Sequence, residues 1–233
     1  MASRTADNES FARLNQEWLG VKVDGWAGRK TTAAWLERTG VEQPPAAPSM
    51  FPAPDERSLR AYYGEPGDEG NLVFFNLPYP MVLAWDHSVT VTRQRCHRLV
   101  KDSLSGCLEE VRDHYETREA LEAAGMHLLG GIFLDRKQRG SNRISTHAWG
   151  ISIDLDPLRN AFRTPCRRLA ESDAVYQYAV ERWVAYRRRR GLSTSPVPEA
   201  SMPEAVARIF VSNGWTSGGV SWGRDGMHYQ ATR

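Results

Sequence analysis

The stretch Ser145-Thr-His-Ala-Trp-Gly-Ile-Ser-Ile-Asp-Leu-Asp-Pro157 sets a histidine and an aspartate beside an alternating apolar run. Side chains of a strand alternate between its two faces, so the isoleucines and the leucine share one face while Asp154 lies on the other. Gly150 can bend the chain so that His147 returns over the face that carries Asp154. The stretch therefore predicts a strand beside half of a metal site.

The C-terminal tail, Trp222-Gly-Arg-Asp-Gly-Met-His-Tyr-Gln230, offers the missing ligand. Two histidines and one carboxylate are a normal ligand set for catalytic zinc, which keeps a fourth position open for water. His147, Asp154 and His228 supply that set. Asp225 is the natural general base, because a separate carboxylate can take the proton of an attacking water.

A cation is also needed for the developing oxyanion or for a substrate carboxylate, and a guanidinium binds either of them in a forked geometry. The polar loop from Arg136 to Arg143, which leads straight to His147, provides several. Cysteine offers no competing metal site. Three widely spaced thiols without a Cys-x-x-Cys pair indicate ordinary buried or surface residues: Cys96, Cys107 and Cys166.

Length and composition leave most classes of protein open. A chain of 233 residues is one large domain or a catalytic domain with a small appendage, and its net charge of +2 does not favour nucleic acid or a membrane surface. The first ten residues lack the apolar core of a signal peptide, and no run approaches the length of a membrane span. We therefore expect a protein made in the cytoplasm without a signal peptide and without membrane insertion.

The chain is predicted to have two parts joined by a linker. Residues 1–40 combine two amphipathic runs around an Asp24-Gly25 turn, which predicts a short helical module. Residues 41–57 include five prolines and read as an extended linker. Residues 58–233 form the main domain.

Periodic apolar residues predict the elements of the main domain. Helices are expected at about residues 91–124, 167–191 and 203–212, and short strands at residues 72–77, 81–85 and within 125–133. His97 and His114 would belong to the first helix, as surface or packing residues, and His87 would lie at a turn. Four consecutive arginines, residues 187–190, end the second helix, where they suit the helix dipole.

The two motifs, Ser145-x-His147-x-x-Gly150-x-x-x-Asp154 and Trp222-x-x-Asp225-x-Met227-His228-Tyr229, together resemble the family of zinc D-alanyl-D-alanine carboxypeptidases and L-alanyl-D-glutamate endopeptidases, which includes phage endolysins. The resemblance spans residues 130–230. It implies an α+β fold of the zinc DD-peptidase or hedgehog-like type, with a small central antiparallel sheet and flanking helices.

The resemblance also assigns roles to individual residues. It implies one zinc ion per chain held by His147, Asp154 and His228, with Asp225 as general base and Arg136 as the arginine that polarises the substrate. The substrate-binding residues expected from the same motifs are Arg139, Ser145 and Trp222. Ser152 and Gln230 depart from the alanine and glutamate that are frequent in the family, and the helix at residues 167–191 looks like an insertion.

The N-terminal module resembles a small helical peptidoglycan-binding domain found beside many cell-wall hydrolases. Both resemblances imply bacterial peptidoglycan as the partner. Without a signal peptide, a phage lysis or virion-associated enzyme that reaches the wall after its release fits better than a resident envelope enzyme, and we expect a monomer. One alternative is a non-catalytic wall-binding or virion structural protein that keeps the fold. Another is a nucleic-acid binder that uses residues 187–190. The sequence leaves open which peptidoglycan bond is cut.

Overall fold

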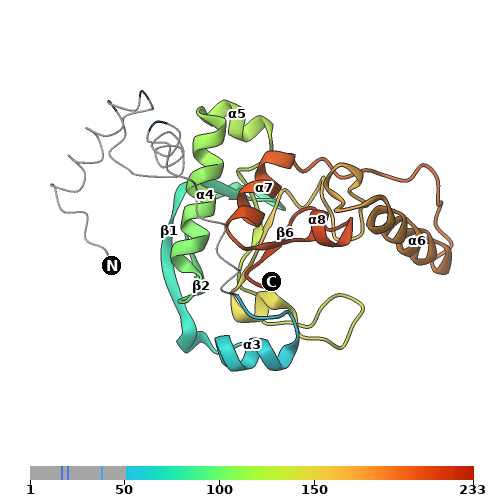
Figure 1. The fold of residues 1–233 in the computed structure, drawn as a ribbon, viewed down its shortest axis with the longest axis horizontal. Helices are drawn as coiled ribbons and strands as arrows, with labels where there is room; N and C mark the ends of the chain where they lie inside the picture. The colour runs from blue at the N-terminus through green and yellow to red at the C-terminus, as the bar shows by residue number, and fades with distance from the viewer. Residues whose placement is uncertain (1–16, 18–19, 21–37, 39–50) are drawn as a thin grey trace. The chain divides into compact units, whose positions relative to one another are not determined.

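The computed structural model describes Glu17, Gly20, Arg38 and residues 51–233 (Figure 1). The chain divides into two compact units, residues 1–47 and residues 48–233, and the second is described below. The predicted helical module at residues 1–40 and most of the predicted linker lie outside the described residues and stay predictions. The ring of Phe51, from the end of that linker, packs edge-on against Trp215 with 5.8 Å between the ring centroids.

The second unit is an α+β domain built on one six-stranded sheet, which confirms the predicted fold class. Its strands are β1 (Leu72–Leu83), β2 (Asp86–His97), β3 (Leu128–Gly131), β4 (Ser152–Leu155), β5 (Thr216–Ser217) and β6 (His228–Gln230). Its helices are α3 (Glu56–Tyr63), α4 (Lys101–Tyr115), α5 (Arg118–Ala123), α6 (Asp173–Arg189), α7 (Glu204–Ser212) and α8 (Gly218–Trp222). The strand order is β2-β1-β3-β4-β6-β5, and every pair is antiparallel except the parallel pair of β1 and β3.

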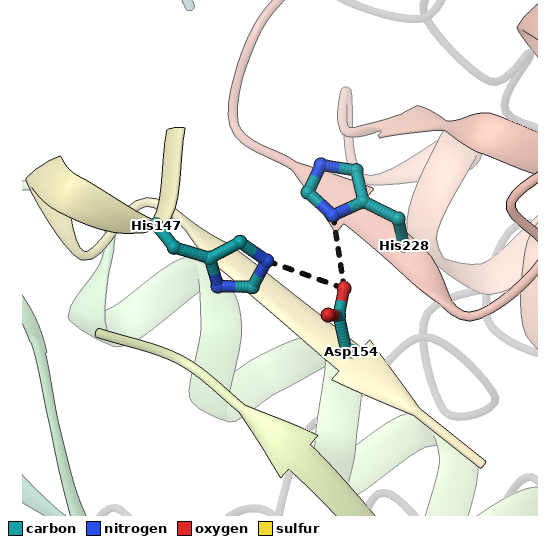
Figure 2. Close-up of side chains that lie close together, drawn as sticks. All are labelled: His147, Asp154 and His228. Carbon is teal, nitrogen blue, oxygen red and sulfur yellow. Dashed lines mark hydrogen bonds and ion pairs between the residues drawn. The ribbon is translucent and has the colours of Figure 1, made fainter. Parts of the chain in front are cut away.

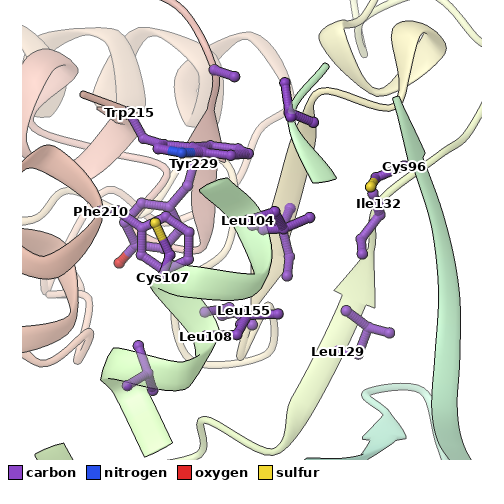
Figure 3. Packing of buried hydrophobic residues seen from close by; sticks show 14 of the residues in the cluster. Cys96, Leu104, Cys107, Leu108, Leu129, Ile132, Leu155, Phe210, Trp215 and Tyr229 are labelled. Carbon is purple, nitrogen blue, oxygen red and sulfur yellow. The ribbon is translucent and has the colours of Figure 1, made fainter. Parts of the chain in front are cut away.

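The hydrophobic core lies between one face of this sheet and the helices α4 and α7. α4 buries Leu104, Cys107, Leu108 and Val111, beside residues of β3 and β4 (Figure 3). Phe210 of α7 stacks on Tyr229 of β6, with ring centroids 4.1 Å apart. Since side chains alternate along a strand, Tyr229 points into this core and its neighbours in β6 point to the opposite face.

The first predicted helix, residues 91–124, is wrong over its first part. Residues 91–97 belong to β2, which forms a hairpin with β1, and helix α4 begins only at Lys101. The alternation of Val and Thr from Val89 to Thr92 favours a strand, because β-branched side chains fit a pleated surface. His97 is therefore a buried strand residue.

Residues 72–77 and 81–85 were predicted as separate strands, but residues 72–83 form one strand, β1. Pro78 and Pro80 lie where the pairing of β1 with β2 shifts register, between Asn76 and Met81. A proline lacks an N–H to donate, and an irregularity in the ladder tolerates it. The strand therefore continues through both prolines.

The two later predicted helices are present with adjusted ends. The helix at residues 203–212 is α7, and the helix at residues 167–191 is α6, which begins at Asp173 because Ser172 caps it. The Ser172 hydroxyl accepts a hydrogen bond from the backbone N–H of Val175. Among the described residues, no helix has both the length and the apolar character needed to cross a membrane.

Candidate metal centre

The register of β4 against β6 places two of the predicted ligands side by side. Asp154 lies directly opposite His228, one position along from the pair of Ile153 and Tyr229. Because Ile153 and Tyr229 face the core, Asp154 and His228 share the opposite face. The sheet thus joins residues that are 74 positions apart in the chain.

His147 reaches the same face from the 3₁₀ helix η2 (Thr146–Trp149). The turn ends at Gly150, whose φ of 68° lies in the left-handed region, and a Cβ there would lie 2.8 Å from a methyl carbon of Leu72. Only glycine fits this turn easily. The predicted bend at Gly150 is therefore confirmed, and it carries His147 back over β4.

Hydrogen bonds fix which nitrogen of each histidine faces Asp154. The Nδ1–H group of His147 donates to the carbonyl oxygen of Ile132 at 2.9 Å, so its Nε2 faces Asp154 Oδ1 at 3.3 Å. In His228 the two ring nitrogens have the opposite roles. Nε2–H donates to Gln230 Oε1 at 3.1 Å, and Nδ1 lies 2.9 Å from Asp154 Oδ1 (Figure 2).

His147, Asp154 and His228 form the one group of three or more His, Cys, Asp or Glu side chains, among the described residues, that could hold a metal ion. Their ligand atoms all lie within 4.8 Å of one another, and all three residues are buried. Ligating histidines in metal sites normally donate their second N–H to a carbonyl or another acceptor, as both do here. The donor set of two imidazoles and one carboxylate therefore fits a zinc ion.

Charge at this cluster is balanced by an ion pair between protonated His228 and ionised Asp154. Burial disfavours the charged form of His228, but the hydrogen bond and negative charge of Asp154 outweigh it and raise the pKa of His228 to about 9. Burial also disfavours ionised Asp154, but the charges and hydrogen bonds of His147 and His228 hold its pKa well below its ordinary value. A metal cation bound to these atoms replaces the proton on His228, so its binding releases protons.

Asp225 lies beside this cluster but is not one of its ligands. Its side chain is buried, and its Oδ1 has no hydrogen-bond partner among the described residues. Burial raises the pKa of Asp225 to about 7, with a further contribution from the charge of Asp154. A carboxylate with such a pKa can accept and return a proton near neutral pH.

The backbone around Asp225 is held in an unusual conformation. Its φ is 62°, a region that aspartate tolerates better than most residues. The carbonyl oxygen of Asp225 accepts the N–H of His228 at 3.0 Å and lies so close to Gly218 that a Cβ there would be 2.5 Å away. Gly218, the first residue of α8, therefore gives the loop of Asp225 the space that it needs.

The other predicted site residues differ in how they are placed relative to the three candidate ligands. Arg136 is half-buried, donates to the carbonyl of Lys137 at 3.0 Å, and its charge lowers the pKa of Asp225. Trp222 stacks on the ring of His228 at 5.8 Å between centroids. Ser145 is buried, and its hydroxyl accepts the N–H of His147, which caps η2. Arg139 is exposed and lines a cavity whose walls do not include the three ligands.

Sequence reasoning missed a buried polar chain behind the ligands. Ser152 Oγ donates to Thr146 Oγ1 at 2.7 Å, and Thr146 Oγ1 donates to Gln230 Oε1 at 3.1 Å. The amide nitrogen of Gln230 donates to Thr232 Oγ1 at 2.8 Å. The only signal in the sequence was the departure from the family pattern at two of these positions, Ser152 and Gln230.

Two histidines and an aspartate that converge on one point, with a separate buried acid beside them, define a centre of the metallopeptidase type. A family model described as D-alanyl-D-alanine carboxypeptidase matches residues 139–231, which hold all four of these side chains. The match covers these residues alone, and it confirms the predicted resemblance to the zinc DD-peptidase family. Neither the curated proteins nor the solved structures contain a significant match.

Proposed function

We propose that this protein is a zinc-dependent peptidase that hydrolyses a peptide bond in the stem peptides of bacterial peptidoglycan, as a D-Ala-D-Ala carboxypeptidase or an L-Ala-D-Glu endopeptidase. The observation that carries the proposal is the convergence of His147, Asp154 and His228 next to the buried carboxylate of Asp225, whose Oδ1 has no hydrogen-bond partner among the described residues. The family match over residues 139–231 supports the same class of substrate.

One zinc ion per chain would be held by His147 Nε2, His228 Nδ1 and Asp154 Oδ1, the atoms that the hydrogen bonds leave facing one another. Zinc supplies Lewis acidity, which lowers the pKa of a water ligand to about 7. Ile132 and Gln230 fix the orientation of the two imidazoles. The three ligands are thereby preorganised before substrate arrives.

Asp225 takes the proton of the attacking water and delivers it to the leaving amine nitrogen. Its burial and its pKa of about 7 suit both transfers near neutral pH. Arg136 supplies positive charge to the oxyanion that develops on the scissile carbonyl. This assignment rests on the electrostatic effect of Arg136 on Asp225.

The biological setting that we infer is lysis of a bacterial wall by a phage enzyme. This inference rests on the resemblance of the site motifs to those of endolysins, and on the resemblance of residues 1–40 to a peptidoglycan-binding module. Both resemblances point to the same polymer, so peptidoglycan is the proposed partner.

The test compares the wild type with Asp225→Ala and His147→Ala for zinc content and for the loss of turbidity of purified peptidoglycan. We expect about one zinc per chain in wild type and in Asp225→Ala, and activity at least about 10²-fold lower in Asp225→Ala, because Asp225 acts on the water and does not hold the metal. His147→Ala should lose zinc and activity together. Mass spectrometry of the released fragments identifies the bond.

Wild-type protein that takes up zinc but leaves peptidoglycan intact would contradict the enzymatic proposal and favour a wall-binding or structural protein. Full activity in Asp225→Ala would remove Asp225 from its role as base.

A further inference from the structure

A cavity of about 390 Å³ lies between the loop that precedes His147 and the helix α6. Its lining is strongly basic and contains no aspartate or glutamate. Six arginines contribute to it: Arg139, Arg143, Arg163, Arg182, Arg189 and Arg224. The helix that looked like an insertion in the sequence therefore builds one wall of a positively charged site.

Three of these arginines, Arg163, Arg182 and Arg224, lie over aromatic rings. The guanidinium of Arg163 lies 3.7 Å from the centroid of the Tyr186 ring, and that of Arg224 lies 5.1 Å from the centroid of Phe162. Within residues 51–233, none of the six forms an ion pair with an acidic side chain. Ion pairs within the described residues therefore leave the positive charge of the cavity uncompensated.

The crowding of these cations has a measurable electrostatic consequence. Burial lowers the pKa of Arg224, the negative charge of the neighbouring Asp225 opposes this, and the charges of Arg182 and Arg163 lower it further. Like charges that are brought together without ion-paired counter-charges destabilise the fold, and an anion that enters the cavity relieves that repulsion. The cavity is therefore suited to oxyanions, which guanidinium groups bind in a forked, bidentate geometry.

The chain connects this cavity closely to the metal centre. Arg224 is the residue immediately before Asp225, while Arg139 and Arg143 belong to the loop between Arg136 and His147. α6 contacts α8, the helix that ends at Trp222, and the N–H of Glu171 donates to the carbonyl of Val220 in α8 at 2.8 Å. The basic cavity is thus anchored to the same segments that carry the base and the first ligand.

We propose that this cavity is a subsite for carboxylate groups of the substrate peptide, on one side of the bond that is cut. The proposal rests on the proposed function, because a stem peptide that contains D-glutamate and a free C-terminus presents at least two carboxylates. A volume of about 390 Å³ falls in the range of sites for small ligands and suits a short piece of peptide.

The geometry favours a peptide over a nucleic acid. Binding of single-stranded nucleic acid normally uses aromatic faces on which bases stack. Here the ring of Tyr186 is approached by Arg163 and Arg190, and the ring of Phe162 by Arg163 and Arg224. Guanidinium groups already occupy these ring faces. The cavity is therefore suited to anions and not to stacked bases.

The test measures peptide binding by calorimetry with the full-length chain, zinc-loaded and carrying Asp225→Ala to prevent cleavage. The probes are a synthetic stem peptide with free carboxylates and the same peptide with its carboxylates amidated. The cavity variant adds Arg163→Gln and Arg182→Gln. The matched control adds Arg168→Gln and Arg188→Gln, which remove the same charge from exposed positions outside the cavity.

We expect the free-carboxylate peptide to bind the cavity variant at least about tenfold more weakly than the control, which corresponds to about 1.4 kcal/mol. The amidated peptide should bind both proteins equally weakly. A second cavity variant, Arg139→Gln with Arg189→Gln, changes only exposed side chains and should show the same loss without disturbing packing. In the active enzyme, the cavity substitutions should raise KM and leave kcat unchanged.

Equal affinity for the free and amidated peptides, or equal binding by the cavity variant and the control, overturns the subsite. Binding of poly(glycerol phosphate) that depends on the cavity arginines, with no discrimination between the two peptides, overturns it as well. A wild type that binds the peptide through these arginines but never cleaves peptidoglycan would instead contradict the proposed function and leave the carboxylate site standing.

Discussion

At the scale of single residues, the candidate metal centre depends on the hydrogen bond that the second ring nitrogen of each histidine makes. Ile132 fixes His147 through a backbone carbonyl, which no side-chain substitution at position 132 removes. His228 depends on the side chain of Gln230, which is itself held by Thr146 and Thr232. The orientation of His228 is therefore the more sensitive of the two to mutation.

The two residues that depart from the family pattern, Ser152 and Gln230, are linked in this structure. Ser152 lies opposite Gln230 across β4 and β6, and Thr146 joins their side chains through hydrogen bonds. Serine at position 152, where alanine is frequent in the family, adds a hydroxyl that is part of the support behind His228.

Replacing Gln230 by alanine should lower the affinity for zinc by about 10- to 100-fold, because His228 loses the acceptor that orients its ring. Competition with a chromogenic chelator measures this affinity directly. Gln230→Glu keeps an acceptor at the same place and serves as the control, with affinity close to that of the wild type or higher. An unchanged affinity in Gln230→Ala would show that Gln230 does not support the ligand.

At the scale of secondary-structure elements, the hairpin of β1 and β2 holds α3 in place through one buried histidine. Nε2–H of His97 donates to the carbonyl of Tyr63 at 2.9 Å, and Nδ1 accepts the N–H of Leu99 at 3.2 Å. Both nitrogens are committed to the neutral ring, and burial lowers the pKa of His97 below its ordinary 6.5. Protonation of His97 would add an N–H at Nδ1, and this group would then face the N–H of Leu99.

This arrangement predicts a loss of stability in acid. The unfolded chain takes up a proton on His97 as the pH falls through about 6.5, and the folded chain does so only at lower pH. The contribution of His97 is therefore fully present above pH 6.5 and is lost as the pH falls below it. His97→Gln should cost about 1–3 kcal/mol at pH 7.5 and flatten this dependence.

Urea unfolding of the wild type and of His97→Gln at several values between pH 5 and pH 7.5 measures the effect. The difference in unfolding free energy between the two proteins should shrink toward pH 5. A constant difference over this range would show that His97 does not titrate with folding.

At the scale of the whole molecule, the division at residue 47 separates the described unit, residues 48–233, from the segment predicted to bind the wall. A fragment of residues 48–233 contains the core that the described residues form and the candidate metal centre. It should therefore bind zinc as the full chain does, but sediment with purified peptidoglycan less completely, because the predicted wall-binding module is missing.

Sedimentation is best measured in the Asp225→Ala background, where the wall stays intact, with the full chain carrying the same substitution as the control. Equal sedimentation of the fragment and the full chain would assign wall binding to residues 48–233 alone.

The sequence by itself indicated the candidate ligands, the proposed base and the resemblance to the family, because their residue types and spacing suit the chemistry of zinc and the two strands that carry them. His147 and Asp154 lie close together along the chain, around the bend at Gly150. Asp225 and His228 likewise lie close together in the C-terminal tail. Local chemistry of this kind can be predicted without knowing what else packs nearby.

Only the tertiary structure decided what depends on long-range pairing. The chain from 91 to 97 became a strand because β1 was there to pair with it. The register of β4 against β6 brought Asp154 to His228 and joined Ser152 to Gln230. The arginine cavity formed because α6 folds back beside a loop some forty residues earlier, and no local pattern specifies which distant surfaces meet.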